Sequence, residues 1–397
     1  MPPYRLADNE KASLFKKVAI VGADESDEIG IVPHKSTLQL HAEAARNALE
    51  DAGVELSEVD GIFSAGSAGW SPTLQIAEYL GIQPKYTDNT SVGGSSFVID
   101  VEHAAAAIAA GLINVALITH GESGASGGRR GGSARPALDL QHPSAQFEMP
   151  YHVGGAPTHY AMACMRHMHQ YGTTHEQLAE IAVATRKWAM LNPKAMMRDP
   201  ITIDDVLSSR WIAYPFHLLD CCLVTDAGGA VVITSAERAR DCKKAPVWVL
   251  GSGEATTHQT IASMPDLTTT PASISGPRAF AMAGVRHEDI DVVEVYDSFT
   301  YTALVTLEAL GFCKPGEGGA FVSGQRTGPG GDFPLNTNGG GLSYTHPGMY
   351  GIFLLIEAAR QLRGECDDRQ VSDAKLACVN GTGGTLSSTG TLILGAG

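Results

Sequence analysis

The chain repeats one pattern of structural elements in its first and second halves. Each copy is a buried apolar strand, an apolar helix, a short acidic turn and a second buried strand. The three segments are 17–22, 41–54 and 59–65 in the first copy and 245–251, 276–285 and 290–297 in the second. Strand–helix–strand units place their strands in parallel, with right-handed crossovers. The repeat therefore predicts a duplicated α/β unit.

A second correspondence follows in both copies. Ser95–Gly111 is typical of a helix and precedes a strand at 114–121, and Gly351–Gly364 is typical of a helix before a strand at 375–381. Both helices end at glycine, a common C-terminal signal. A chain of 397 residues is also too long for one ordinary core. We therefore expect two α/β halves.

A segment of different character interrupts the first half. It opens with a glycine-rich run and contains a helical stretch from Thr174 to Leu191. Long loops that carry their own helices tend to be functional. The predicted division is an N-terminal half formed by 1–121 and 218–240, an inserted loop domain at 122–217, and a C-terminal half at 241–397.

The charge of the chain excludes several classes of partner. Lys and Arg number 28 and Asp and Glu number 43, so the formal net charge is −15. Such an acidic chain is a poor candidate for nucleic acid or an anionic membrane. The N-terminus carries charges where a signal peptide needs an apolar run, and the longest apolar stretches are too interrupted to cross a bilayer. We expect a cytoplasmic protein.

Neither a disulfide framework nor a metal site is expected. The seven cysteines are scattered, Cys221 and Cys222 are the only close pair, and no C-x-x-C spacing occurs. Several histidines cluster in the inserted segment, but His167 and His169 are two apart on a predicted helix and so do not share a face.

Four motifs, in chain order, resemble those of the thiolase superfamily. They are DNTSVGGSSF (88–97), VYDSFT (295–300), GGGLSYTHPGMYG (339–351) and NGTGGTLSSTGTLIL (380–394). The resemblance implies a thiolase fold, in which duplicated βαβαβαββ halves form a five-layered αβαβα arrangement. It also implies a homodimer that pairs the sheets of two chains.

The chain lacks the cysteine that thiolases use as their acyl-accepting nucleophile. Val92 stands where that cysteine is expected, and Ser91 precedes it. A serine alcohol is far less acidic than a thiol, so we interpret these small residues as helix caps that leave room for a bulky acyl chain. With VYDSFT and SYTHPG, this segment resembles the lipid-transfer-protein-type aldolases of steroid side-chain degradation, which are similar to sterol-carrier-protein-X thiolases.

The aldolase resemblance implies a reaction and a partner. The reaction is retro-aldol cleavage of a 3-hydroxyacyl-CoA to a ketone or aldehyde and a short acyl-CoA such as propionyl-CoA. No cofactor is implied, since the CoA thioester is the substrate. The partner is a small protein with an OB-fold and a zinc ribbon, often fused to a hydratase, and the implied assembly is a heterotetramer.

Three residues are the predicted acid–base and polarising groups. His346 matches the thiolase histidine and is expected to donate to the enolate oxygen, although it could simply support its loop. Tyr296 replaces the oxyanion-hole Asn or His, and Tyr344 stands where the aldolases carry a tyrosine. We expect the two tyrosines to be the acid–base pair, in either order. Tyr344 could instead pack beneath the following turn.

The closing segment offers further candidates. Cys378 aligns with the second thiolase cysteine if no gap is allowed, but it ends an apolar strand, where a cysteine is commonly buried. Asn380 falls nearer an active-site histidine in a different alignment. The backbone N–H groups of Gly381 and Gly383 are candidates for an oxyanion or pantetheine contact, and Gly340 for close backbone approach.

Basic residues should line the path of the CoA phosphates. Arg129 and Arg130 lie in the glycine-rich run, and Arg186 lies in the inserted helical stretch. Most charged residues only face solvent, so these three are weak candidates.

Two other functions compete with the aldolase prediction. One is a thiolase-like acyltransferase, including the thiolase subunit of a degradation complex. The absence of a cysteine at position 92 argues against its covalent mechanism. The other is a carrier that binds acyl-CoA or lipid without turnover, against which the retained Tyr296, Tyr344 and His346 argue.

Overall fold

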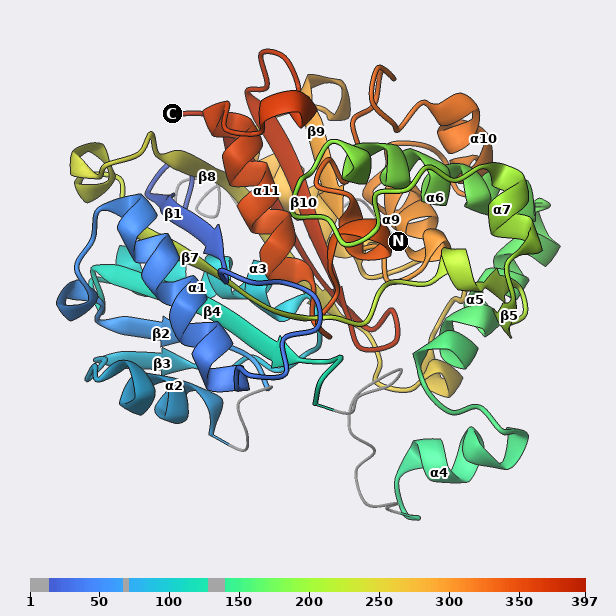
Figure 1. Ribbon diagram of the computed structural model, residues 1–397, viewed down its shortest axis with the longest axis horizontal. Coiled ribbons are helices and arrows are strands. Elements are labelled where there is room, and N and C mark those ends of the chain that lie inside the picture. Colours follow the sequence, from blue (N-terminus) through green and yellow to red (C-terminus); the bar gives the residue numbers. More distant parts are fainter. Residues whose placement is uncertain (1–13, 67–70, 128–139) are drawn as a thin grey trace.

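The computed structural model describes residues 14–66, 71–127 and 140–397, and its largest element is a nine-stranded mixed sheet (Figure 1). The strand order is β3-β2-β4-β7-β1-β8-β11-β10-β9. Their bounds are β1 Val18–Glu25, β2 Gly61–Phe63, β3 Tyr86–Asp88, β4 Val115–Ser123, β7 Asp226–Ser235, β8 Val247–Thr256, β9 Val292–Val295, β10 Leu376–Gly383 and β11 Ser388–Gly395.

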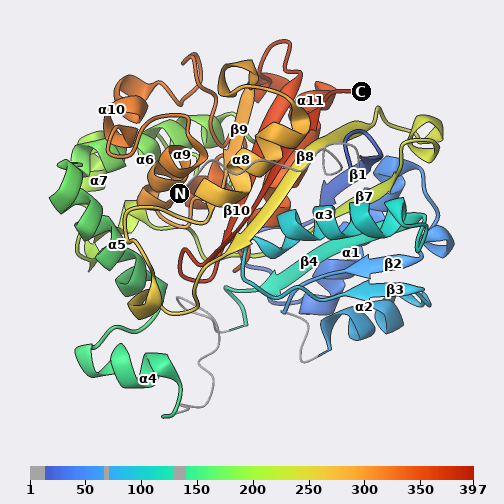
Figure 2. The same ribbon diagram turned by 180° about the vertical axis from the view of Figure 1, so that it is seen from behind.

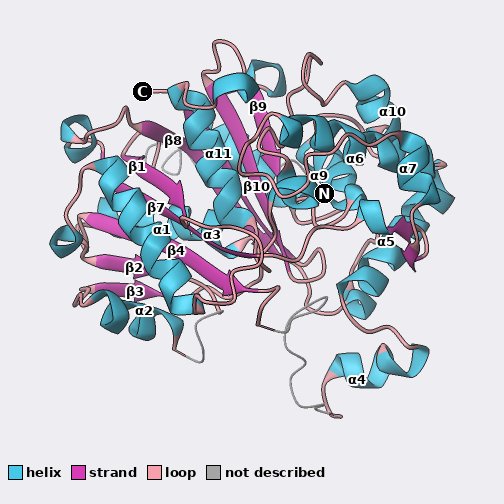
Figure 3. Cartoon of the chain, viewed as in Figure 1, coloured by secondary structure: helices cyan, strands magenta, loops and turns pink. Residues whose placement is uncertain are grey.

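Helices cover the sheet in layers (Figure 3). Those of the two halves are α1 Thr37–Ala52, α2 Pro72–Leu80, α3 Ser96–Ala109, α8 Ala272–Ala283, α9 Thr300–Leu310, α10 Gly318–Val322 and α11 Gly351–Arg363. Helix α1 packs on first-half strands and α8 on second-half strands, whereas α3 and α11 contact strands of both halves and each other. Helices α1 and α11 face the viewer in Figure 1, and α3 and α8 in Figure 2. The predicted α/β class is confirmed.

The internal duplication is visible in the sheet. The order β1-β7-β4-β2 of the first half returns as β8-β11-β10-β9 in the second, with the same parallel and antiparallel pairings. The halves are joined where β1 pairs with β8 in antiparallel fashion. The second half has no full counterpart of β3: among the described residues, the position beside β9 is occupied by a single parallel bridge, between Leu335 and Val293.

The first helix of each half also ends in the same way. Helix α1 ends at Gly53 with φ 68° and α8 ends at Gly284 with φ 71°, both in the left-handed region that favours glycine. These glycines belong to the Ala-Gly-Val triplets that the two copies share, 52–54 and 283–285.

The segment between β4 and β7 packs mainly on the second half. Its elements are α4 Pro143–Phe147, α5 Ala156–Tyr171, α6 His175–Met190, α7 Ile203–Ser208 and the hairpin of β5 Trp211–Ala213 and β6 Phe216–His217. Helix α6 contacts α9, α10 and the π-helical turn Gly340–Tyr344, and Tyr160 and Leu178 join the core around Phe299. In the described part of the chain, no helix is long and apolar enough to cross a membrane.

Equivalent glycines set how closely the first helix of each half packs on its strand. A Cβ atom at Gly22 of β1 would lie 2.0 Å from the carbonyl oxygen of Ala48 in α1. One at Gly251 of β8 would lie 2.1 Å from the carbonyl oxygen of Ala279 in α8. Any side chain at either position would therefore push the helix off the sheet.

We expect Gly251→Ala to lower the free energy of unfolding by about 1–3 kcal/mol, because α8 must move away from β8. Urea unfolding of the variant and the wild type measures the change. Gly154→Ala is the matched control, since an added Cβ there has nothing within 4 Å. Equal unfolding free energies for the two variants would contradict this packing account.

Candidate active site

Tyr296 follows β9 directly and lies between the two halves. Its backbone N–H donates to the carbonyl oxygen of Asn380 (3.0 Å), which continues the parallel pairing of β9 with β10. Its side chain is 4% exposed. A Cβ atom at Gly94, before α3, would lie 2.1 Å from a ring carbon of Tyr296. The phenol of the second half is thus packed against the start of the central helix of the first half.

The hydroxyl of Tyr296 is hydrogen-bonded to His346. The oxygen lies 2.8 Å from Nε2 of His346 and accepts from the backbone N–H of Tyr350 (3.2 Å). A second acceptor, the carbonyl oxygen of Gly348, lies 3.4 Å away. Since the Tyr350 N–H occupies one lone pair, the tyrosine proton is directed to His346 or Gly348.

His346 is held by its backbone. Its N–H donates to Oγ1 of Thr225 (2.9 Å), and its carbonyl oxygen accepts from the N–H of Thr225 (3.2 Å). Desolvation lowers the pKa of His346 to about 4, and hydrogen bonds with its own backbone and that of Leu223 offset part of this effect. The imidazole is therefore neutral at neutral pH, and Nε2 can accept the proton of Tyr296.

Asp297 connects the segments that carry Tyr296 and His346. Its carboxylate accepts from the N–H groups of Gly341 (2.7 Å) and Leu342 (3.3 Å), four to five residues before His346. A Cβ at Gly340 would lie 2.0 Å from one carboxylate oxygen. Burial raises the pKa of Asp297 to about 7. The close approach predicted for Gly340 is therefore made to Asp297.

The loop before α3 meets the closing glycine turn. A Cβ at Gly93 would lie 2.4 Å from the backbone nitrogen of Gly384, and one at Gly383 would lie 2.0 Å from the carbonyl oxygen of Val92. The predicted position of the missing nucleophile, Val92, is thus in the same region as Tyr296. A Cβ at Gly381 would meet Ser95 and Val98, so this glycine serves the contact of β10 with α3.

The serines of this loop bond within the protein. Ser96 Oγ accepts from the N–H of Val92 (3.1 Å) and donates to the carbonyl oxygen of Gly93 (2.7 Å). Ser95 Oγ bonds with Ser388 Oγ at 3.1 Å. Ser91 is exposed. In the described structure none of these hydroxyls bonds with a histidine that could activate it.

Tyr344 lies apart from this pair. Its ring packs edge-on against Phe353, which stacks on Tyr350, which in turn contacts Tyr296. Among the described residues no hydrogen bond joins Tyr344 to Tyr296 or His346. Its charged surroundings include Glu25 and Arg360, and burial raises its pKa well above the usual value. The structure thus supports Tyr296 with His346 more directly than the pairing of the two tyrosines.

Cys378 and Asn380, the two candidates from the closing segment, are both buried within the protein. Cys378 is fully buried on the α8 side of β10, in a core with Ile393, and burial raises its pKa. This position argues against the proposed proton transfer by its thiol. Asn380 is also fully buried, and its Nδ2 donates to Oγ1 of Thr391 (2.8 Å).

Of the three arginines predicted to line the path of the CoA phosphates, the structure describes Arg186. Arg186 is buried, its Nε donates to Oγ of Ser343 (2.9 Å) and its NH1 to the carbonyl oxygen of Asp199 (2.8 Å). It therefore holds α6 to the turn before His346 rather than facing solvent, and these bonds argue against its predicted CoA role. Arg129 and Arg130 lie outside the described residues.

One contact at the site could not be found from the motifs. The hydroxyl of Tyr160, from α5 of the inserted segment, donates to the carbonyl oxygen of Gly384 (3.1 Å). Burial raises the pKa of Tyr160 to about 12, so it remains protonated. No spacing links Tyr160 with the closing turn, because the two meet only through the packing of α5.

Comparison with known proteins identifies relatives of the chain. Residues 253–396 match the family model described as thiolase C-terminal domain-like. A steroid side-chain-cleaving aldolase of Thermomonospora curvata is 37% identical over 91% of this chain and 94% of its own length. A 17-hydroxy-3-oxo-4-pregnene-20-carboxyl-CoA lyase of Mycobacterium tuberculosis is 35% identical over 88% of this chain and 92% of its own.

The chain belongs to the thiolase superfamily, in its sterol-carrier-like aldolase branch. A solved structure agrees: the Ltp2–ChsH2(DUF35) aldolase superposes with a TM-score of 0.88 at 33% identity, covering 97% of this chain and 99% of that one. For this thiolase-superfamily member, the resemblance of the motifs and the thiolase fold are both confirmed.

We expect the stability of this aldolase-branch protein to fall as pH drops from about 6.5 towards 4. In this window the unfolded chain protonates His346 while the folded chain does not, so the unfolded state binds more protons. His346→Gln does not titrate, and its unfolding free energy should fall less steeply when both proteins are unfolded in urea across this range.

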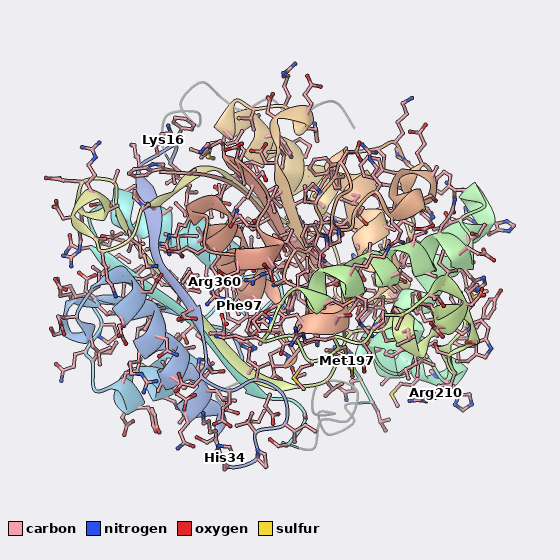
Figure 4. The ribbon with its side chains drawn as sticks, turned by 45° about the horizontal axis from the view of Figure 1, so that its top comes forward. Lys16, His34, Phe97, Met197, Arg210 and Arg360 are labelled. Atoms are coloured by element: carbon pink, nitrogen blue, oxygen red, sulfur yellow. The ribbon has the colours of Figure 1, made fainter. Side chains whose placement is uncertain are left out.

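The control for this experiment is His34→Gln. The His34 side chain is 62% exposed and lies at the periphery (Figure 4). Its removal should leave the pH dependence of the wild type unchanged. If His346→Gln and the wild type lose stability in parallel, the assignment of His346 as a desolvated, neutral imidazole is wrong.

Proposed function

We propose that the protein cleaves a 3-hydroxyacyl-CoA by a retro-aldol reaction, releasing a ketone or aldehyde and a short acyl-CoA such as propionyl-CoA. The observation that carries this proposal is the Tyr296–His346 hydrogen bond of 2.8 Å beside a helix start that has Val92 in place of a nucleophile. A proton-transfer pair without an acyl-accepting group suits a reaction that forms no acyl-enzyme. The names and similarity of the relatives support the same reaction.

In the proposed mechanism a proton is transferred from the substrate through Tyr296 to His346 and is later returned through Tyr296 to the substrate. The 3-hydroxyl of the substrate gives its proton to the oxygen of Tyr296 while the tyrosine proton moves to Nε2 of His346. The C2–C3 bond breaks, the alkoxide becomes the carbonyl product, and the electron pair forms a thioester enolate. The imidazolium returns the proton through Tyr296 to C2. Atoms and charges balance without a cofactor.

Burial favours a relay over a free phenolate. It raises the pKa of Tyr296 well above its usual value of 10, so a preformed phenolate is costly. A hydroxyl that accepts one proton while it donates another avoids that state. The lowered pKa of His346 makes its imidazolium a strong acid, which suits the return of the proton.

The enolate oxygen needs nearby donors. We propose the backbone N–H groups of Gly93 and Gly94, at the positive end of α3, with that of Gly384 in the facing turn. The Gly93 and Gly384 backbones are in close contact, since a Cβ at Gly93 would lie 2.4 Å from the backbone nitrogen of Gly384. Gly383 and Asn380 shape this turn, and Ser91 and Val92 border the acyl group.

Tyr344 remains the second candidate for the acid or base. The rings of Phe353 and Tyr350 lie between Tyr344 and Tyr296. If both tyrosines act, a bound substrate must therefore reach both phenols. Substitution of each tyrosine separates these roles.

The resemblance of the motifs also implies a molecular setting. We propose a bulky, steroid-like substituent on the substrate, a homodimer, and a small partner of OB-fold and zinc-ribbon type that completes a heterotetramer. We further propose that the protein acts in the cytoplasm. The similar solved aldolase is named with a second, DUF35 component, which supports a partner.

We expect the protein, alone or with that partner, to release short-chain acyl-CoA from a branched 3-hydroxyacyl-CoA without added CoA. Tyr296→Phe should lower kcat by about 10²–10⁴-fold, because it removes the hydroxyl that relays the proton. Chromatography of the CoA products measures both. Tyr301→Phe is the control, since Tyr301 is fully buried and donates to the carbonyl oxygen of Leu267 (3.2 Å).

One further substrate, one binding measurement and one further variant decide between mechanisms. Cleavage of a 3-oxoacyl-CoA only when CoA is added would replace the aldolase by a thiolytic acyltransferase. Tight acyl-CoA binding without any cleavage would favour a carrier. A large loss of activity in Tyr344→Phe with little loss in Tyr296→Phe would move the relay to Tyr344.

A further inference from the structure

Asp100 is a buried carboxylate without a partner. It lies in α3, its exposed fraction is 0%, and neither carboxylate oxygen has a hydrogen-bond partner in the described structure. Leaving a charged carboxylate in this state costs several kcal/mol, so such a group is normally neutralised or bound to a cation. Burial raises its pKa well above the usual value. Tyr296 and His346 make no use of this group.

Two other potential ligands face Asp100. One oxygen of Asp100, one of Asp88 at the end of β3, and a ring nitrogen of His103 on α3 all lie within 4.8 Å of one another. Oδ2 of Asp88 is 3.0 Å from Nδ1 of His103. In a tetrahedral site with bonds of about 2.1 Å, ligand atoms are roughly 3.4 Å apart, so these side chains need little movement to bind one ion.

The far side of His103 completes the pattern of a metal-binding histidine. Its Nε2 lies 3.2 Å from Oε2 of Glu254, on β8. Metal-ligating histidines usually donate their other N–H to a carboxylate, which fixes the ring and its tautomer. Here Nδ1 faces Asp88, and Glu254 is the orienting carboxylate on the opposite nitrogen.

The local charges favour a cation. Asp88, Asp100 and Glu254 surround a single imidazole, and their combined charge when ionised exceeds what a protonated His103 can neutralise. Arg278 pairs with Glu102 (3.1 Å) and its charge also lowers the pKa of Glu254, so it offsets only part of this negative charge. Thr90 Oγ1 lies 3.3 Å from Nδ1 of His103 and donates to Asp88 (2.8 Å). A divalent ion would balance the remaining charge.

We propose that Asp88, Asp100 and His103 bind a divalent transition-metal ion of the Zn²⁺ or Mn²⁺ class. One imidazole nitrogen and two carboxylates suit these ions, and water would fill the remaining position. The ion would take the place of a proton on Nδ1 of His103, because a metal-binding imidazole nitrogen must be unprotonated. It also binds the Asp100 carboxylate in its charged form. The proposal departs from the sequence prediction of no metal.

The position of the site indicates a structural role. Asp88 ends β3, and Asp100 and His103 lie one and two turns into α3, so the ion would bind the strand to the helix across the loop 89–95. That loop contains Val92, Gly93 and Gly94, which contact the closing turn and Tyr296. Metal binding should therefore stabilise the chain and hold this loop in place, without entering the reaction.

Metal content and thermal stability test this proposal without any measurement of activity. The full chain, without an affinity tag, is treated with a chelator, dialysed and mixed with Zn²⁺ or Mn²⁺ at micromolar concentration. We expect one ion per chain by elemental analysis and a rise in Tm of several degrees, because the ion binds only the folded state.

Matched variants assign the ion to this cluster. Asp100→Asn and His103→Gln should lose the ion and the rise in Tm, and the control His34→Gln, an exposed histidine that also lies near a carboxylate, should keep both. Metal-free Asp100→Asn should melt no lower than metal-free wild type, since it removes a buried acid, which excludes misfolding as the cause. A wild type that binds neither ion, or an Asp100→Asn variant that binds equally well, overturns the proposal.

Discussion

The geometry of the active site depends on the carboxylate of Asp297. It follows Tyr296 in the chain and accepts hydrogen bonds from Gly341 and Leu342, which begin the turn that leads to His346. A buried carboxylate with two backbone donors fixes two segments that are some forty residues apart, and leaves the Tyr296 oxygen and His346 Nε2 at hydrogen-bond distance. Asn338 supports the same turn, since its Oδ1 accepts from the N–H of Gly340 and the hydroxyl of Tyr350.

Local patterns predicted the fold well because the fold is built twice from the same pattern. The apolar runs, the alanine-rich helices and their glycine ends all act within a few residues, and β1, α1, β8 and α8 lie where the repeat placed them. The bridge of Leu335 beside β9, at the position that β3 has in the first half, was not predictable in this way. It depends on how a long connection packs beside β9.

The site was predicted only as far as the motifs reach. Tyr296 and His346 follow from motifs whose spacing from a strand or helix is fixed. Arg186, in contrast, has the charge expected for CoA but uses it on Ser343 and Asp199, and that outcome depends on the packing of α6. The alignment left the position of Cys378 ambiguous, and its burial in the core on the α8 side of the sheet argues against a role for its thiol. The cluster of Asp88, Asp100 and His103 has no signature, because β3 and α3 meet only in the folded chain.

Because the candidate site lies at the junction of the halves, neither half contains the whole site. Gly93 and Gly94 belong to the first half, whereas Tyr296, His346 and Gly384 belong to the second. The residue equivalent to Tyr296 after β2 is Ser64, whose hydroxyl donates to the carbonyl oxygen of Thr119. The two copies therefore share a scaffold, but the first has a serine where the second has the candidate tyrosine. A fragment that ends anywhere between α3 and β9 would keep Gly93 and Gly94 but lack Tyr296 and His346, so the candidate site forms only where both copies are in contact.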